Sequence, residues 1–151
     1  MNIRMVSAGV LLLGALAWAA ADDPEIERAK LAGKWELQSD NTGKGPVWVI
    51  EDKRFSLHIT RLVGEQKLCE FECDLGKECK VKDSGKSVTE QIYFNGPKLV
   101  ELETKGNDVV KRLFTAADKP DTLQVEVIQL VPSGKTETLV FKRVAVSQAK
   151  Q

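Results

Sequence analysis

The chain has 151 residues with 22 basic and 22 acidic side chains, so its formal net charge is zero at neutral pH. This balance shows no excess of basic residues, which argues against a nucleic-acid partner. A chain of this length forms one ordinary domain that is large enough to bury its own core.

The N-terminal stretch has the pattern of a secretory signal peptide. Arg4 supplies a positive charge, residues 6–16 are almost wholly apolar, and three alanines at 19–21 offer a small-residue cleavage site. The alternative is a membrane anchor, although the apolar run is short for crossing about 30 Å of hydrocarbon. We therefore expect residues 1–21 to be removed, leaving residues 22–151 as a secreted or periplasmic domain with no membrane span.

One short helical segment precedes a series of predicted strands. Residues 25–32 have the pattern of one or two helical turns, and no convincing helix follows. Short alternating segments separated by turn residues are typical of an all-β barrel or sandwich. The short connections favour antiparallel pairing of neighbours, and a long antiparallel sheet avoids exposed edges by closing. We expect an all-β, antiparallel up-and-down β-barrel of about 8–10 strands, with a sandwich as the second choice. The expected strands cover residues 34–38, 47–50, 55–61, 68–75, 79–82, 87–94, 99–104, 109–115, 122–131 and 136–144.

The alternation in two of these segments assigns faces. In residues 55–61, Phe55, Leu57 and Ile59 share one face, and His58 lies on the other. In residues 68–75 the apolar face carries the side chains of Cys69, Phe71, Cys73 and Leu75, and acidic residues lie opposite. We expect the apolar faces to point into the barrel.

The sequence around Gly33 and Trp35 resembles the Gly-x-Trp opening of the calycin superfamily, which includes lipocalins and fatty-acid-binding proteins. In that superfamily a short helical turn enters the first strand and the tryptophan plugs one end of the barrel. Later segments resemble strands of intracellular lipid-binding proteins in the same order, among them residues 70–78, 88–100 and 138–144. The resemblance covers residues 33–144. It implies a calycin barrel, with Gly33 and Trp35 as structural residues of the barrel end.

The chain departs from the lipid-binding family in two ways. The family normally has a helix-turn-helix lid between its first two strands, whereas only residues 41–46 lie at this point here. Many members also bind a fatty carboxylate through an Arg-x-Tyr pair on the last strand, and the matching positions are Leu139 and Phe141. Arg112 matches the other inward arginine of the family. An identical ligand is therefore not expected.

The resemblance implies a non-catalytic protein that binds a small hydrophobic or amphipathic ligand. The candidate ligand-binding residues are Arg112, as an anion anchor inside the barrel, with Phe71 and Phe141 in the apolar wall. The alternative for Arg112 is a solvated arginine on the outer wall, because a one-residue slip in register reverses the face. The alternative for the aromatic residues is simple core packing.

The three cysteines predict one disulfide and one remaining thiol. Cys69 and Cys73 are four residues apart on one strand, about 13 Å, and a disulfide needs Cα atoms within about 7 Å. Cys79 can reach either of them across the turn at 75–78, and we favour Cys73–Cys79. A metal site built from three thiolates is the less favoured alternative in an exported chain.

The sequence gives little reason to expect catalysis. His58 is the only histidine, and it shares a strand face with Ser56 and Thr60. We find no Ser-His-Asp arrangement, no paired histidine ligands and no glycine-rich phosphate loop, so we expect no enzyme, metal or cofactor. The alternative function is a protein-interaction module such as a calycin-type protease inhibitor, which would use an exposed segment at residues 22–30.

Overall fold

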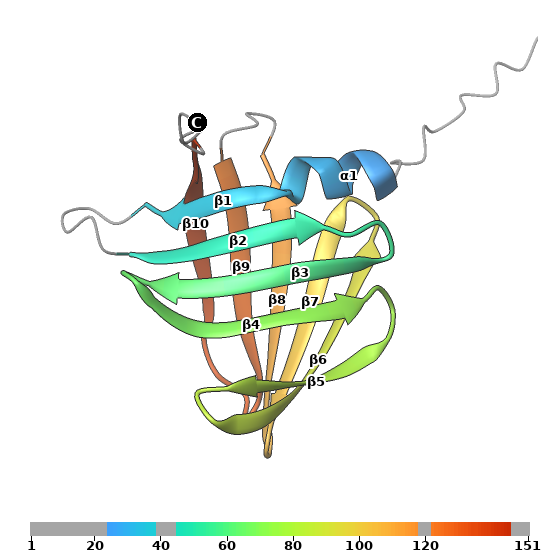
Figure 1. Cartoon of the computed structure of the whole chain (residues 1–151). Coiled ribbons are helices and arrows are strands. Elements are labelled where there is room, and N and C mark those ends of the chain that lie inside the picture. Colours follow the sequence, from blue (N-terminus) through green and yellow to red (C-terminus); the bar gives the residue numbers. More distant parts are fainter. Residues whose placement is uncertain (1–23, 39–44, 118–121, 146–151) are drawn as a thin grey trace, which may run out of the picture.

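The computed structural model describes residues 24–38, 45–117 and 122–145 of the chain. The predicted signal peptide at residues 1–21 therefore lies outside the described residues. Within the described part, one helix is followed by ten strands (Figure 1). None of the described helical segments is long and apolar enough to cross a membrane. The elements are α1 (Pro24–Leu31), β1 (Gly33–Leu37), β2 (Pro46–Asp52), β3 (Ser56–Val63), β4 (Gln66–Asp74), β5 (Glu78–Asp83), β6 (Lys86–Asn95), β7 (Lys98–Lys105), β8 (Asp108–Ala116), β9 (Thr122–Val131) and β10 (Thr136–Val144).

The ten strands form one antiparallel sheet that curls into a nearly closed barrel. Strands adjacent in sequence pair with each other except for β4 and β5, and β1 also pairs with β10, so that the sheet order runs from β4 through β1 and β10 to β5. Only β4 and β5 remain as edges without hydrogen-bonded pairing between them. The predicted up-and-down β-barrel is confirmed.

Turn chemistry fixes the register of the hairpins. The β5–β6 connection places Ser84 at a φ of 49° and Gly85 at a φ of 80°. Two consecutive left-handed residues make the type I′ turn, whose twist matches that of paired strands. This turn sets Asp83 opposite Lys86, and the whole β5–β6 ladder follows from that pair.

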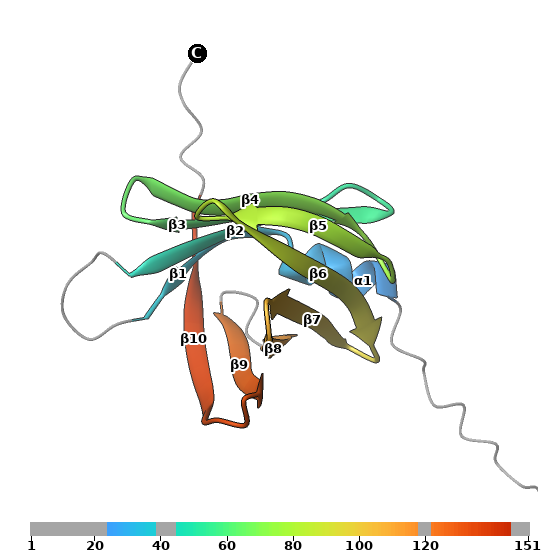
Figure 2. The same cartoon turned by 90° about the horizontal axis from the view of Figure 1, so that it is seen from below.

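The seam between β4 and β5 is held by a short turn and a disulfide. Cys73 on β4 is bonded to Cys79 on β5, with the two Cα atoms 5.7 Å apart. In the turn itself, the Leu75 backbone N–H donates to the Phe55 carbonyl at 3.0 Å and the Gly76 N–H donates to the Ile92 carbonyl at 2.7 Å. Seen from below, β4 and β5 overlap (Figure 2), whereas Figure 1 shows them diverging away from the turn. The covalent link holds the two edge strands together at the turn, where no ladder does.

One end of the barrel is closed by α1 and Trp35. The Trp35 side chain is fully buried, and its indole N–H donates to the Leu31 carbonyl at 2.8 Å. The guanidinium of Arg143 lies 4.1 Å from the Trp35 ring centroid and donates to the Ala32 carbonyl at 2.6 Å. Gly33 has a φ of 144°, and a Cβ there would lie 2.3 Å from the Arg143 Nη1. The structure thus places Gly33 and Trp35 at this end of the barrel.

The predicted inward direction of Phe55 is wrong. Its side chain is 71% exposed, because β3 begins only at Ser56 and Phe55 belongs to the preceding turn. In that turn Arg54 has a φ of 77°, and the Phe55 N–H donates to the Lys53 carbonyl at 3.0 Å. The alternation of apolar and polar residues in the sequence includes Phe55, one residue before β3 begins. The backbone there forms a turn and not a pleated strand, so the alternation does not predict the direction of the Phe55 side chain. Leu57 and Ile59 are fully buried, as expected.

The cysteine arrangement predicts the thiol count of the mature protein. When the protein is denatured without reductant, one thiol per chain should react with an alkylating reagent, and mass spectrometry should assign it to Cys69. In the folded protein this thiol should react slowly, because Cys69 is buried and burial raises its pKa. Three reactive thiols under oxidising, metal-free conditions would contradict the Cys73–Cys79 bond.

Candidate functional site

The interior of the barrel has an apolar wall built around Trp48. The rings of Trp48 and Phe114 have centroids 5.3 Å apart, and those of Trp48 and Phe141 are 5.0 Å apart. Phe71 and Phe141, two of the residues proposed from the sequence, are buried inside the barrel at 5% and 0% exposure. These tilted contacts are favourable aromatic geometries.

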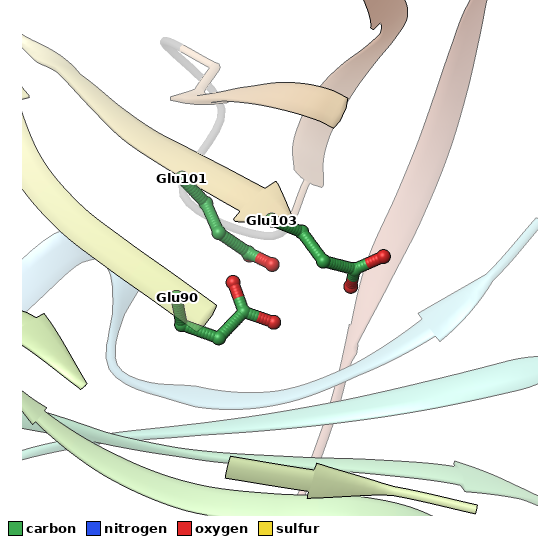
Figure 3. A group of neighbouring side chains, drawn as sticks. All are labelled: Glu90, Glu101 and Glu103. Carbon is green, nitrogen blue, oxygen red and sulfur yellow. The ribbon is translucent and has the colours of Figure 1, made fainter. Parts of the chain in front are cut away.

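Charged side chains occupy the same interior, toward the end of the barrel away from α1. Glu90 on β6, Glu101 and Glu103 on β7, Arg61 on β3 and Arg112 on β8 all point inward. The ladder places Glu101 opposite Arg112 and Glu103 opposite Glu90, so the pairs share one face of the sheet. Figure 3 shows how the three carboxylates converge from two neighbouring strands. We call these five residues the interior charge cluster.

Two arginines bridge two of the carboxylates. Arg112 Nη1 donates to Glu101 at 2.9 Å and to Glu103 at 3.1 Å. Arg61 reaches the same pair from the other side of the barrel, with Nη2 on Glu101 and Nη1 on Glu103 at 3.3 Å. The Arg61 guanidinium also lies 4.9 Å from the Trp48 ring centroid. Burying these charges is tolerable because each has an opposite charge in hydrogen-bond contact.

The structure places Arg112 inside the barrel, with its side chain 15% exposed. It does not leave the guanidinium open to an anionic ligand, because Glu101 and Glu103 both accept from it. An anion arriving at Arg112 would have to compete with two resident carboxylates. The anchor role that the resemblance implies for this residue is therefore weakened.

Glu90 and Glu101 differ in ionisation. Burial, and then the charge of Glu101, raise the pKa of Glu90 to about 9, so this carboxyl is protonated at neutral pH. Burial alone would also raise the pKa of Glu101, but the charges of Arg61 and Arg112 outweigh it and hold the pKa below its ordinary value. At neutral pH the cluster thus places a neutral Glu90 beside an ionised Glu101.

The carboxyl groups of Glu90 and Glu101 face each other within the cluster (Figure 3). A side-chain hydrogen bond between neutral Glu90 and Glu101 helps to lower the pKa of Glu101. One carboxylate oxygen from each of Glu90, Glu101 and Glu103 lies within 4.8 Å of the others, a spacing that could hold a metal ion. The two arginines already bring the positive charge that such an ion would supply, so we assign no metal here.

A cavity of about 260 Å³ borders the cluster. It lies where β2 begins and β3 ends, at the ends of these strands farthest from α1 (Figure 1). Its wall combines aromatic, aliphatic and charged groups, as small-ligand sites commonly do. The lining residues are Pro46, Trp48, Arg61, Leu62, Leu68, Cys69, Asp83, Glu103 and Arg112.

Four members of the cluster were missed in the sequence, although the pattern contained a signal for two of them. Glu90 lies between Val88 and Ile92 at strand spacing, so it shares their inward face. Arg61 continues the inward row of Leu57 and Ile59 in the same way. A charged residue in an inward row indicates a buried polar site. The sequence of β7 gave no such signal, because Val100 and Leu102, which lie on the face opposite Glu101 and Glu103, are apolar. The pattern therefore did not show that the glutamates face inward.

His58 lies outside this interior. It faces away from the core on β3, and its Nε2 is 3.1 Å from Glu70 Oε1 on the exposed face. No nucleophile is placed beside it among the contacts of the described residues. The geometry therefore gives His58 no catalytic partner set.

Solved structures share this barrel, although no family model and no curated protein sequence matches the chain. A secretory abundant heat soluble protein from Ramazzottius varieornatus has a TM-score of 0.66 at 13% identity, covering 76% of this chain and 96% of that one. A Schistosoma mansoni fatty acid binding protein in complex with arachidonic acid has a TM-score of 0.66 at 15% identity, covering 79% and 99%. The fluorescent protein UnaG has a TM-score of 0.62 at 15% identity, covering 77% and 98%.

The chain shares the calycin-type barrel fold of these structures. Sequence identities this low establish the fold of the barrel and nothing finer, so the ligand of this protein must be argued from its own interior. Its connection between β1 and β2 is only residues 38–45. That is too short for the two-helix lid of the lipid-binding family.

The raised pKa of Glu90 predicts an unusual dependence of stability on pH. The unfolded carboxyl ionises near 4.5 and the folded one near 9, so the free energy of unfolding should fall as pH rises through this window. The slope should approach about 1.4 kcal/mol per pH unit. Because Gln cannot ionise, Glu90→Gln should match the wild type near pH 4.5 and exceed it increasingly toward pH 9 in urea unfolding. The control is Glu137→Gln, at an exposed position on β10. A constant difference between Glu90→Gln and the wild type across this range would contradict the assignment.

Proposed function

We propose that this calycin binds a small amphipathic molecule at the open end of its barrel and carries out no chemistry on it. The observation that carries the proposal is the cavity of about 260 Å³, with Trp48 on one side and charged groups on the other. An apolar part of the ligand would lie against Trp48 and Leu62, and a polar part would face the interior charge cluster. The volume, slightly below the range of ordinary drug-sized sites, suits a short ligand.

The similar structures support a binding role at the level of the fold. One of them is a fatty acid binding protein with arachidonic acid bound, and another is named a fatty acid transporter. We infer a binding protein rather than an enzyme for two reasons. The fatty acid binding protein and the fatty acid transporter share the barrel fold of this chain. Among the described residues, His58 has no set of catalytic partners. Phe71 and Phe141 are proposed to shape the site from behind the lining, and Arg112, which lines the cavity, is proposed to hold Glu101 and Glu103 in place rather than to bind a fatty carboxylate.

We also propose that the domain is exported, to a secreted or periplasmic location. The signal pattern at residues 1–21 supports this, and the Cys73–Cys79 disulfide suits an oxidising compartment. The alternative role as a protease inhibitor has less support. Residues 24–30 of its proposed exposed segment lie in α1, with Glu27 buried, and Leu31, the next residue, is buried in the core.

Filling the cavity mouth tests the binding role. Leu68 lines the cavity and is 38% exposed, so Leu68→Trp should fill the mouth without disturbing the core. We expect the affinity for octanol, measured by titration calorimetry, to fall about tenfold or more. Leu130 is a matched control, since it is 42% exposed on β9 and does not line the cavity. Equal octanol binding by Leu68→Trp, Leu130→Trp and the wild type would place the ligand elsewhere.

A further inference from the structure

The outer wall of the barrel is apolar where the inner wall carries the interior charge cluster. On β7, Glu101 points inward, so Val100 and Leu102 on either side of it point outward. On β8, Leu113 points outward beside the inward Arg112. An antiparallel sheet that packs one face on a core normally has polar side chains on the other face. These two strands reverse that pattern.

The outward side chains of β7, β8 and β9 lie next to one another. Strand register aligns them in two adjacent rows, which are Leu102, Lys111 and Ile128, then Val100, Leu113 and Glu126. We call the four apolar members, Val100, Leu102, Leu113 and Ile128, the outer apolar face. None of these four belongs to the core cluster or packs against it. Figure 2 shows β7 to β9 opposite β2 to β4, with no other described element outside them.

Two side chains of opposite charge lie within this face. Lys111 stands between Leu102 and Ile128 in one row, and Glu126 stands beside Leu113 in the other. Lys111 and Glu126 are diagonal neighbours across β8 and β9, yet neither forms an ion pair with a residue that the structure describes. The face therefore offers one unpaired positive charge and one unpaired negative charge among apolar side chains, so its charges are complementary to those of an identical face.

We propose that the outer apolar face binds a second copy of this chain in a two-fold symmetric dimer. A two-fold axis in the plane of contact, along the line from Leu113 to Ile128, exchanges the two sides of that line. Lys111 lies on one side and Glu126 on the other, so each Lys111 meets the partner's Glu126. Leu113 and Ile128 lie near the axis and pack against their counterparts. Every contact of this arrangement occurs twice, as an isologous interface requires.

The area of the face sets the strength of the dimer. Four strands from β6 to β9, with a spacing of about 4.8 Å and about eight residues each, present roughly 500 Å² per copy. A stable interface buries about 800 Å² per partner, and smaller ones belong to weak, reversible complexes. We therefore expect a dimer that dissociates in the micromolar range. It uses only the outside of the wall, so the inference does not depend on the proposed ligand.

Sedimentation velocity of the mature wild type tests the association itself. The weight-average mass should rise from one chain toward two as the concentration increases from about 5 to about 500 μM. A mass that stays at one chain over this range would overturn the proposal. Flotation of a monomeric wild type with phosphatidylcholine vesicles would assign the face to lipid, and would overturn it as well.

Charge reversal tests the pairing of Lys111 with the partner's Glu126. Lys111→Glu sets two carboxylates against each other in each contact, and Glu126→Lys sets two ammonium groups against each other. Each variant alone should weaken the dimer by about tenfold or more. An equimolar mixture of the two variants should dimerise as the wild type does, because both contacts of the mixed dimer are then attractive. The matched control is Lys80→Glu, at an exposed position on β5, which should dimerise normally.

The variants also give the outcomes that contradict the arrangement. Circular dichroism first establishes that each variant is folded. A dimer that survives Lys111→Glu would be formed by another surface. Two folded variants that stay monomeric after mixing would show that Lys111 does not meet the partner's Glu126. Either result would overturn the proposal.

Discussion

The ion pair between Arg61 and Glu101 crosses the interior of the barrel. It joins β3 in one half of the sheet to β7 in the other, between residues 40 positions apart. Charges so deeply buried are stable only when their remaining hydrogen-bonding capacity is met, and Arg112 and Glu103 meet most of it. This contact therefore spans the barrel beside the cavity, whose wall includes Arg61, Glu103 and Arg112.

The barrel is thereby divided into a closed end and a polar end. Near α1 the interior is filled with apolar side chains around Trp35, among them Leu57 and Leu99, and leaves the barrel end sealed. At the other end the interior is occupied by the charge cluster, whose side chains are joined by ion pairs, and the cavity lies beside it. A barrel with this division offers an amphipathic ligand both an apolar wall and a polar group at a defined depth.

The sequence predicted the strands well because alternation is a local property. The inward rows of β3 and β4 were assigned correctly from Leu57 to Ile59 and from Cys69 to Cys73. Phe55 was misplaced because a turn with a left-handed residue at Arg54 interrupts the pleat. The charge cluster could not be assembled, because which glutamate meets Arg61 depends on the pairing of strands far apart in sequence and on the closure of the barrel. Glu90, between Val88 and Ile92, and Arg61, after Leu57 and Ile59, each carried a readable sign of inward charge.

Carbon-13 NMR of the glutamate side-chain carboxyl groups tests the central claim, that the barrel keeps a neutral acid beside an ionised one in its interior. The Glu90 carboxyl should titrate near pH 9, as its burial beside Glu101 requires. A pKa near 4.5 would contradict this account of the interior.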